Sequence, residues 1–167
     1  SAIAKGYGVD RVAEALEAEG VESFMVEVGG EIRTKGVNDQ GMAWQLAIEI
    51  PDPDRRAIHR VIPVSGASLA TSGDYRNFYL VDGERISHTI DPRSLGPVRH
   101  AQVSASVIHE SCAVADAWAT ALMVLGPEEG LELAEELELA ALLLVSSPAG
   151  IEERMSSAFR ERIESGE

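Results

Sequence analysis

The sequence predicts an α+β domain with a mixed, largely antiparallel sheet and helices packed against it. Strand-like and helical segments are interleaved irregularly along the chain. The regular strand–helix alternation of a parallel sheet is missing, as is the GxGxxG turn of a dinucleotide-binding fold. A length of 167 residues with 45% hydrophobic residues fits one domain with a substantial core.

The first predicted element is a helix over residues 4–19, which ends at Gly20. Its apolar residues recur at helical spacing on one face, with acidic residues opposite: Val9, Val12, Ala13 and Leu16.

The strands are predicted from alternating or β-branched apolar residues bounded by turn residues. They cover residues 23–28, 32–35, 43–50, 57–64, 78–81, 85–89, 103–109 and 139–145. The first four form an antiparallel meander, whose first turn is Gly29-Gly30 because glycine accepts positive φ. The continuous apolar run at 139–145 indicates a central strand.

Residues 71–75 leave three alternatives open. Their small polar residues either cradle a phosphate, hold an aromatic ring near a ligand, or form an irregular strand with a bulge at Gly73. Further along, proline and glycine in residues 91–97 break the sheet.

The second half of the chain adds two helices in succession. A helix around Asp116 closes at Gly126, and Pro127 starts the next helix at a position that proline favours. The acidic stretch 128–138 is predicted to be a solvated helix face, and residues 152–163 an edge strand followed by a short helix.

Net charge and cysteine content exclude several functions. A charge of −14 argues against nucleic acid as a partner, because such binding needs Lys and Arg to neutralise phosphates. Any phosphate must therefore be met locally, by a metal or by backbone amides. The single Cys112 excludes an internal disulfide and is predicted to be a small buried residue and not a reactive thiol.

Asp116 and Thr120 form the candidate metal site. Residues four apart lie on one face of a helix, so both side chains can converge on one ion. Both offer oxygen, which hard cations such as Mg²⁺ prefer, and two protein oxygens leave room for water and a phosphate. The alternative is a plain helix surface.

Four blocks of sequence, in order, carry a more specific signal. They are AIAKGY at 2–7; VGGEIRTKG at 28–36; TSGDYRN at 71–77 with SHTIDP at 87–92; and ADAWATAL at 115–122 with LGP at 125–127. Together they resemble the ApbE family of FAD:protein FMN transferases over nearly the whole chain. The resemblance implies a Mg²⁺-dependent enzyme of ApbE-like fold that moves FMN from FAD to a Thr or Ser hydroxyl of another protein, releasing AMP. Its usual acceptors are subunits of membrane redox pumps.

The resemblance also assigns roles to particular residues. Asp116, Thr120 and the backbone carbonyl of Ala2 match the metal ligands. His88 matches a residue at the FAD site and offers a base near neutral pH. Whether His88 or the metal-bound Asp116 removes the proton of the acceptor hydroxyl stays open.

Two further residues are matched to flavin contacts, with structural alternatives beside them. Lys5 and Ala119 join His88 as cofactor-binding residues, although a lysine at position 5 also fits a solvated helix end. The remaining aromatic and histidine candidates are predicted to be structural or exposed: Trp118, His59, His100 and His109.

Members of the family carry a comparable length of chain before the first block, including an Asp that helps to hold the flavin nucleotide. Residues 1–167 are therefore expected to be the C-terminal part of such a domain. The upstream half is expected as a partner, and the chain without that half is expected to self-associate. The alternatives are a Mg²⁺-dependent FAD pyrophosphatase and a non-catalytic flavin-binding half-domain. The resemblance implies a bacterial periplasmic or inner-membrane-anchored, outward-facing location.

Overall fold

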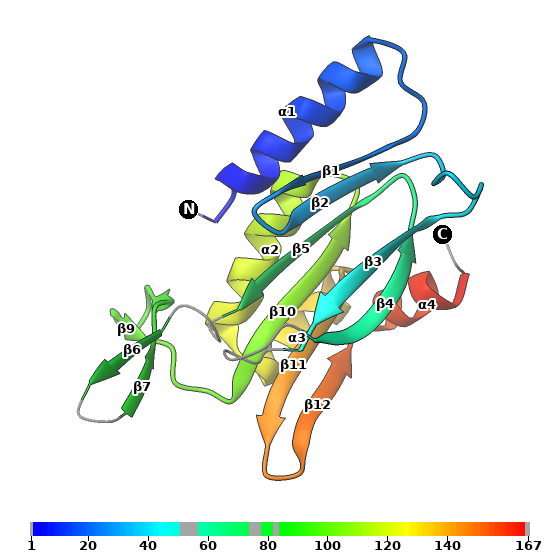
Figure 1. Cartoon of the computed structure of the whole chain (residues 1–167). Coiled ribbons are helices and arrows are strands. Elements are labelled where there is room, and N and C mark those ends of the chain that lie inside the picture. Colours follow the sequence, from blue (N-terminus) through cyan, green and yellow to red (C-terminus); the bar gives the residue numbers. More distant parts are fainter. Residues whose placement is uncertain (1, 51–56, 74–77, 82–83, 166–167) are drawn as a thin grey trace.

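The computed structural model describes residues 2–50, 57–73, 78–81 and 84–165, and shows a central antiparallel sheet with helices against it (Figure 1). The strands of this sheet, in spatial order, are β1 (Phe24–Val28), β2 (Glu31–Lys35), β5 (Ser68–Gly73), β10 (Gln102–His109), β11 (Ala140–Ser147) and β12 (Gly150–Met155). Two-stranded sheets pair β3 (Trp44–Glu49) with β4 (Ile58–Val64), β6 (Phe78–Val81) with β7 (Glu84–Ser87), and β8 (Ile90–Asp91) with β9 (Gly96–Pro97). The helices in the described residues are α1 (Ala4–Ala18), α2 (Cys112–Leu125), α3 (Pro127–Glu136) and α4 (Ser157–Ser165).

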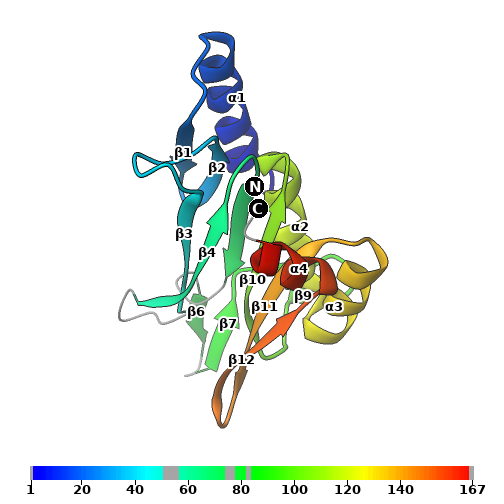
Figure 2. The same ribbon diagram turned by 90° about the vertical axis from the view of Figure 1, so that its right-hand side faces the viewer.

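Other elements pack on both faces of the sheet (Figure 2), and apolar side chains fill both layers. On one face α2 and α3 pack against the sheet, with Leu122 and Leu143 fully buried between them. On the other face, the β3–β4 pair and α4 bury Ile62, Leu142 and Phe159. Because β11 is covered on both sides, its side chains are buried without alternation, as the apolar run in the sequence predicts.

An ion-pair cluster ties the β3–β4 pair to the main sheet. The Glu153 carboxylate on β12 accepts hydrogen bonds from Arg60 at 2.7 and 3.1 Å and lies 2.8 Å from His59 Nε2. Arg60 first, then His59, hold the pKa of Glu153 below its ordinary value, although burial opposes this shift. His59 is thus structural, as predicted.

The α+β prediction is confirmed, but the meander is wrong. β2 pairs with β5 and not with β3, which leaves the β3–β4 hairpin as a separate layer over the sheet. β5 itself is a regular strand that pairs residue by residue with β10 through Gly73, so the predicted bulge is absent there. Residues 51–54 and 82–83, which lie between predicted strands, are outside the described residues.

The face assigned to the first helix also needs correction. Val12 is 46% exposed, whereas Asp10 is only 6% exposed and lies on the buried side of α1 with Val9 and Ala13. The acidic residue is buried because it binds another helix, as described below. None of the helices in the described ranges is long and apolar enough to cross a membrane.

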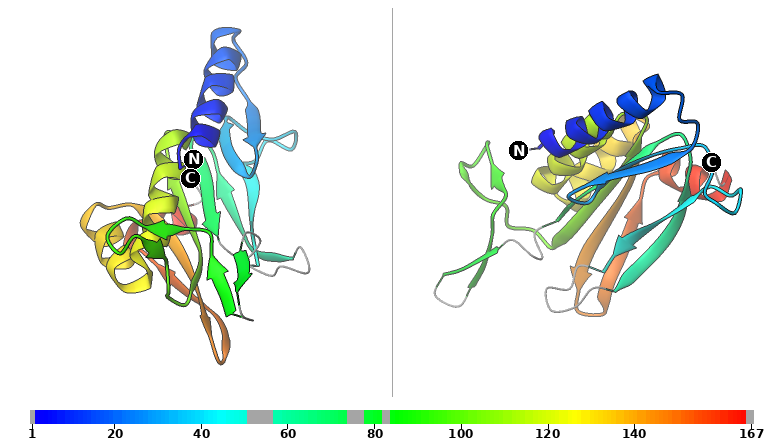
Figure 3. Two further views of the ribbon diagram at one scale, coloured as in Figure 1. Left: turned by 90° about the vertical axis from the view of Figure 1, so that its left-hand side faces the viewer. Right: turned by 45° about the horizontal axis from the view of Figure 1, so that its top comes forward.

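The β6–β7 hairpin stands apart from the main sheet, beyond the ends of β5 and β10 (Figure 3). The chain returns from it through a bend at His88 into β8, which contacts α2. This path brings the segment that contains the predicted base back towards the helix that carries the predicted metal ligands.

Candidate functional site

The N-terminus of α1 lies against the first turn of α2 (Figure 1). A Cβ atom placed on Gly6 would lie 2.3 Å from the Cys112 carbonyl oxygen, a distance that no side chain tolerates. Glycine at this position therefore lets the two helices touch, and the AKGY block reflects a packing requirement as well as chemistry.

Asp116 reaches across this contact. Its Oδ2 accepts a hydrogen bond from the Gly6 N–H at 3.1 Å, and the residue is 3% exposed. Gly6 N–H is one of the donors that a helix leaves unpaired in its first turn, and the N-cap residue Ile3 has no side-chain acceptor to satisfy it. The carboxylate of Asp116, 110 residues away in sequence, supplies this cap.

This bond has a consequence for Ala2. A continued helical pattern would direct the Gly6 N–H to the Ala2 carbonyl, but the N–H is taken by Asp116. Among the described residues, the Ala2 carbonyl oxygen accepts no hydrogen bond. The carbonyl predicted to bind a metal is therefore not occupied by another described group.

Asp10 on α1 makes the reciprocal contact, with the N-terminus of α2. Its carboxylate accepts hydrogen bonds from the N–H groups of Cys112 and Ala113, each at 3.0 Å, from Ser111 Oγ at 2.8 Å and from Arg33 at 2.8 Å. Burial raises the pKa of Asp10, but these bonds outweigh burial and hold the pKa below its ordinary value. Asp10 thus fixes the start of the helix that carries Asp116.

Thr120 lies one helical turn beyond Asp116, as predicted, and its hydroxyl contacts a residue of the sheet. Its Oγ1 is 3.0 Å from Ser72 Oγ on β5. Sequence reasoning did not single out Ser72, because nothing in the spacing of the TSGDY segment indicates contact with a helix more than 40 residues later.

The oxygen donors gathered here fit a hard cation. In the part of the chain that the structure describes, no three His, Cys, Asp or Glu side chains converge as a metal cluster. Asp116 Oδ1 accepts no hydrogen bond from the described residues, which leaves it for a ligand. Mg²⁺ is often held by only a few protein oxygens, and water and phosphate oxygens complete its coordination. One carboxylate, one hydroxyl and one backbone carbonyl would be such a partial set of ligands.

Lys5 is half-exposed and bound to a buried acid. Its Nζ lies 2.6 Å from Oε1 of Glu31, which is 1% exposed, and 3.5 Å from the Gly29 carbonyl. Burial raises the pKa of Glu31, Lys5 opposes the shift, and the nearby Asp116 adds to it. Glu31 Oε2 is buried with no partner among the described residues, and sequence reasoning missed Glu31 as a site residue.

The other predicted site residues fall in contrasting places. His88 is exposed in the bend after β7, and the structure gives it no contact with Asp116 or Thr120. Ala119 is 0% exposed in the core between α2 and the sheet. Its side chain is covered by the core in this structure, and its assignment as a flavin contact stays a prediction.

Cys112 and Trp118 behave as predicted. Cys112 is fully buried, and burial, with the charges of Asp10, Glu31 and Asp116, raises the pKa of its thiol to about 12. Trp118 packs against the core between α2 and the sheet.

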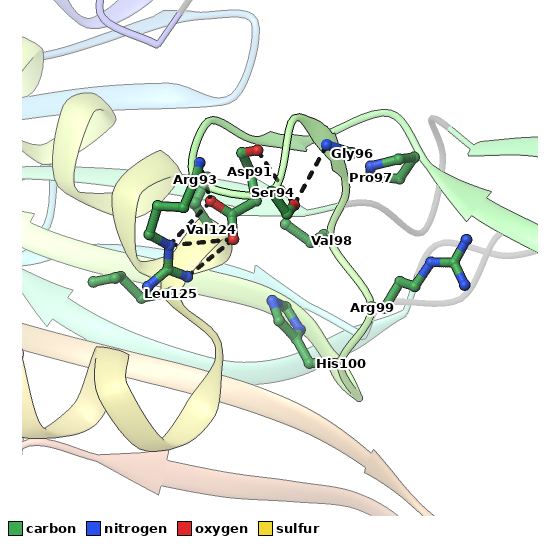
Figure 4. Close-up of a pocket in the computed structure, with 10 residues that line it drawn as sticks. All are labelled: Asp91, Arg93, Ser94, Gly96, Pro97, Val98, Arg99, His100, Val124 and Leu125. Atoms are coloured by element: carbon green, nitrogen blue, oxygen red, sulfur yellow. Dashed lines mark hydrogen bonds and ion pairs between the residues drawn. The ribbon is translucent and has the colours of Figure 1, made fainter.

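A cavity of about 460 Å³ opens at the other end of α2, between its last turn and the loop 91–100 (Figure 4). Arg93 crosses it to bind Asp91 and Glu129. His100 donates from Nε2 to the Met123 carbonyl at 2.9 Å, while its Nδ1 is buried without a described partner. Cationic and imidazole side chains thus line this cavity: Arg93, Arg99 and His100.

Comparison with known proteins identifies the chain's relatives. An FAD:protein FMN transferase of Vibrio cholerae is 46% identical over 160 residues, which cover 96% of this chain and 48% of that protein. An FAD:protein FMN transferase of Haemophilus influenzae is 43% identical over 168 residues, covering 100% of this chain and 49% of that protein. The chain therefore spans about half the length of the curated relatives it matches.

Solved structures agree with these relatives. The apo form of the flavinyl transferase ApbE of Pseudomonas stutzeri superposes with a TM-score of 0.85 at 43% identity, covering 97% of this chain and 50% of that one. The flavin transferase ApbE of Vibrio cholerae gives a TM-score of 0.85 at 45% identity, over 96% of this chain and 50% of that one. The model of the ApbE family matches residues 1–143, which confirms the resemblance seen in the sequence: the chain belongs to the ApbE family.

Proposed function

We propose that this chain supplies the metal-binding half of a Mg²⁺-dependent FAD:protein FMN transferase. The observation that carries the proposal is the placement of Asp116, whose Oδ2 is fixed by the Gly6 N–H while Oδ1 and the Ala2 carbonyl accept no hydrogen bond from the described residues. The names of relatives at up to 46% identity support flavin transfer. Mg²⁺, the acceptor hydroxyl and the release of AMP are parts of the proposal.

In the proposed reaction, the hydroxyl oxygen of an acceptor Thr or Ser forms a bond to the phosphorus of the FMN half of FAD. The bond from that phosphorus to the bridging oxygen breaks, and AMP leaves with this oxygen. A bound Mg²⁺ would neutralise the charge that gathers on the pyrophosphate. Asp116, Thr120 and the Ala2 carbonyl would hold it, because all three present oxygen.

The acceptor hydroxyl must also lose its proton. His88 is proposed as the base, since an exposed imidazole is accessible to a protein acceptor and histidine is the side chain that most often serves as a general base. Asp116 is the alternative base. Lys5 is proposed to meet a nucleotide phosphate, with Glu31 and the Gly29 carbonyl holding its ammonium at the edge of the site.

The partners and location are proposed from the family. The acceptor would be a flavoprotein subunit of a membrane redox pump, and the enzyme would lie in the bacterial periplasm or be anchored to the inner membrane facing outward. A segment upstream of this chain would supply the rest of the nucleotide pocket. The length of the relatives, about twice the matched region, supports this division.

The test is to incubate the chain, joined to its upstream half, with FAD, Mg²⁺ and an acceptor subunit. Flavin fluorescence that stays on the acceptor after denaturing electrophoresis is the expected result. An FAD pyrophosphatase would instead release FMN and AMP without labelling the acceptor. A half-domain that only binds flavin would do neither, and either outcome would refute the transferase.

A further inference from the structure

We propose that Ser72 is a positioning residue of the metal site and acts through the hydroxyl of Thr120. The inference rests on the proposed function, because it concerns the same Mg²⁺ site. Its basis is the 3.0 Å contact between Ser72 Oγ and Thr120 Oγ1, which joins β5 to α2.

The contact is set by two packed elements of the fold and not by a mobile loop. β5 lies inside the sheet between β2 and β10, and α2 packs directly on it. The residue opposite Ser72 on β10 is Ala105, whose small side chain is fully buried under the helix with Ala70 and Ala119. Small residues on both sides bring α2 close enough for the two hydroxyls to meet.

The chemistry of a hydroxyl indicates which of the two side chains donates the hydrogen bond when a metal is bound. A threonine hydroxyl has one proton and two lone pairs, and it can offer a lone pair to a cation only when its proton points elsewhere. Ser72 Oγ is the acceptor that takes this proton. Thr120 then presents its lone pairs to the ion that Asp116 binds.

Ser72 keeps its own proton in this arrangement. Among the described residues Ser72 Oγ has no hydrogen-bonding partner other than Thr120, so none of them accepts this proton. It is available to an oxygen on the metal, either a bound water or a phosphate. Groups that orient metal ligands in this way typically change metal affinity by about 10- to 100-fold.

The same strand offers a matched control. Thr71 Oγ1 lies 2.8 Å from Ser106 Oγ, on the opposite face of the sheet, where neither hydroxyl faces α2. Ser106→Ala therefore removes a hydroxyl–hydroxyl bond of the same kind, one residue away on the ladder, without touching the proposed site.

The test is to titrate the chain with Mn²⁺, detected by electron paramagnetic resonance, as a probe for Mg²⁺. Ser72→Ala should weaken Mn²⁺ binding by about 10-fold or more, and Ser106→Ala should leave it unchanged. In a Thr120→Val background, Ser72→Ala should have no further effect, because Ser72 acts through Thr120. The rise in Tm on adding Mn²⁺ should shrink in Ser72→Ala and persist in Ser106→Ala.

Each failure has a distinct meaning. Unchanged Mn²⁺ affinity in Ser72→Ala, with binding lost in Asp116→Asn, would overturn the role of Ser72 and leave the metal site intact. If Ser72→Ala lowered Mn²⁺ affinity by the same factor in the Thr120→Val background as in the unsubstituted chain, the positioning role would be overturned. No Mn²⁺ binding by the unsubstituted chain, or binding unaffected by Asp116→Asn, would refute the metal site of the proposed function itself.

Discussion

Asp10 on α1 and Asp116 on α2 each accept hydrogen bonds from the N-terminal backbone of the other helix. Asp10 binds the N–H groups of Cys112 and Ala113, and Asp116 binds that of Gly6. Carboxylates at helix N-termini are favourable because they meet unpaired donors and the positive end of the helix dipole. The two helices are thus locked together by the residue proposed to bind the metal, so stability and metal binding are linked at Asp116.

This link separates two substitutions of Asp116. Asp116→Ala should abolish Mg²⁺-dependent transfer and also lower stability by about 1 kcal/mol, because it removes the cap of α1. Asp116→Asn keeps an acceptor for the Gly6 N–H and should lose transfer with a smaller change in stability. Urea denaturation and fluorescent labelling of an acceptor measure the two effects, and normal transfer by Asp116→Asn would remove Asp116 from the site.

Two glycines of α1 provide a second prediction. A Cβ on Gly6 would clash with the Cys112 carbonyl, so Gly6→Ala should push α1 from α2, lower the Tm and disturb Asp116. Gly8 has no atom within 4 Å of its Cβ position, so Gly8→Ala should stabilise the helix by up to about 1 kcal/mol. Calorimetry on both variants checks this, and equal effects of the two would contradict the packing argument.

The pH dependence of stability gives a third prediction. The pKa of Asp10 is lowered in the fold from 3.8, so its ionised form contributes stability well above that pH and loses it as pH falls through the folded pKa. Asp10→Asn should therefore be less stable at neutral pH and lose less stability on acidification below about pH 4. Urea midpoints measured between pH 2 and 7 test this, and parallel curves for both proteins would contradict it.

Most of the fold follows from local pattern in the sequence. The helices around Val9 and Asp116 and the apolar run of β11 are confirmed, because Gly20 and Gly126 mark the helix ends and an unbroken apolar run marks a strand that is covered on both faces. The separation of β3 and β4 from the sheet was not predictable in this way. Whether β2 pairs with β5 or with β3 depends on which strand covers the core. The alternation of apolar and polar residues within each strand is the same in both arrangements.

Only those residues of the candidate site that belong to a recognisable sequence motif could be predicted. Asp116 and Thr120 carry their spacing in the sequence, whereas Ser72 and Glu31 reach the site through contacts between distant segments. Ala119 neighbours the predicted ligands in sequence, but the helix turns its side chain towards the sheet.

A fourth prediction concerns His88. As a base it should contribute roughly 10²- to 10⁴-fold to the rate, so His88→Ala should lose at least the lower factor in turnover while FAD binding changes little. Because His88 is exposed, its removal should change stability by no more than about 0.5 kcal/mol. A variant that transfers normally but unfolds earlier would show that the histidine is structural.

The last prediction concerns the other half of the site. The chain matches about half the length of its relatives, and the proposed nucleotide pocket draws on a further segment. A pocket that normally buries most of a ligand loses affinity when one side is open to water. The chain alone should therefore bind FAD more weakly than micromolar and transfer no FMN above background.

The same arrangement leaves apolar side chains exposed at the start of α1 and on β1, with Ile3 52%, Tyr7 54% and Met25 45% exposed. Contact with the upstream half would cover such side chains, so the chain alone should self-associate, as sedimentation would show. Adding the upstream half, fused or as a separate fragment, should restore Mg²⁺-dependent transfer to an acceptor threonine. Isothermal titration of FAD into the chain alone decides the matter, since micromolar or tighter binding with Mg²⁺ would mean that this half forms the nucleotide site unaided.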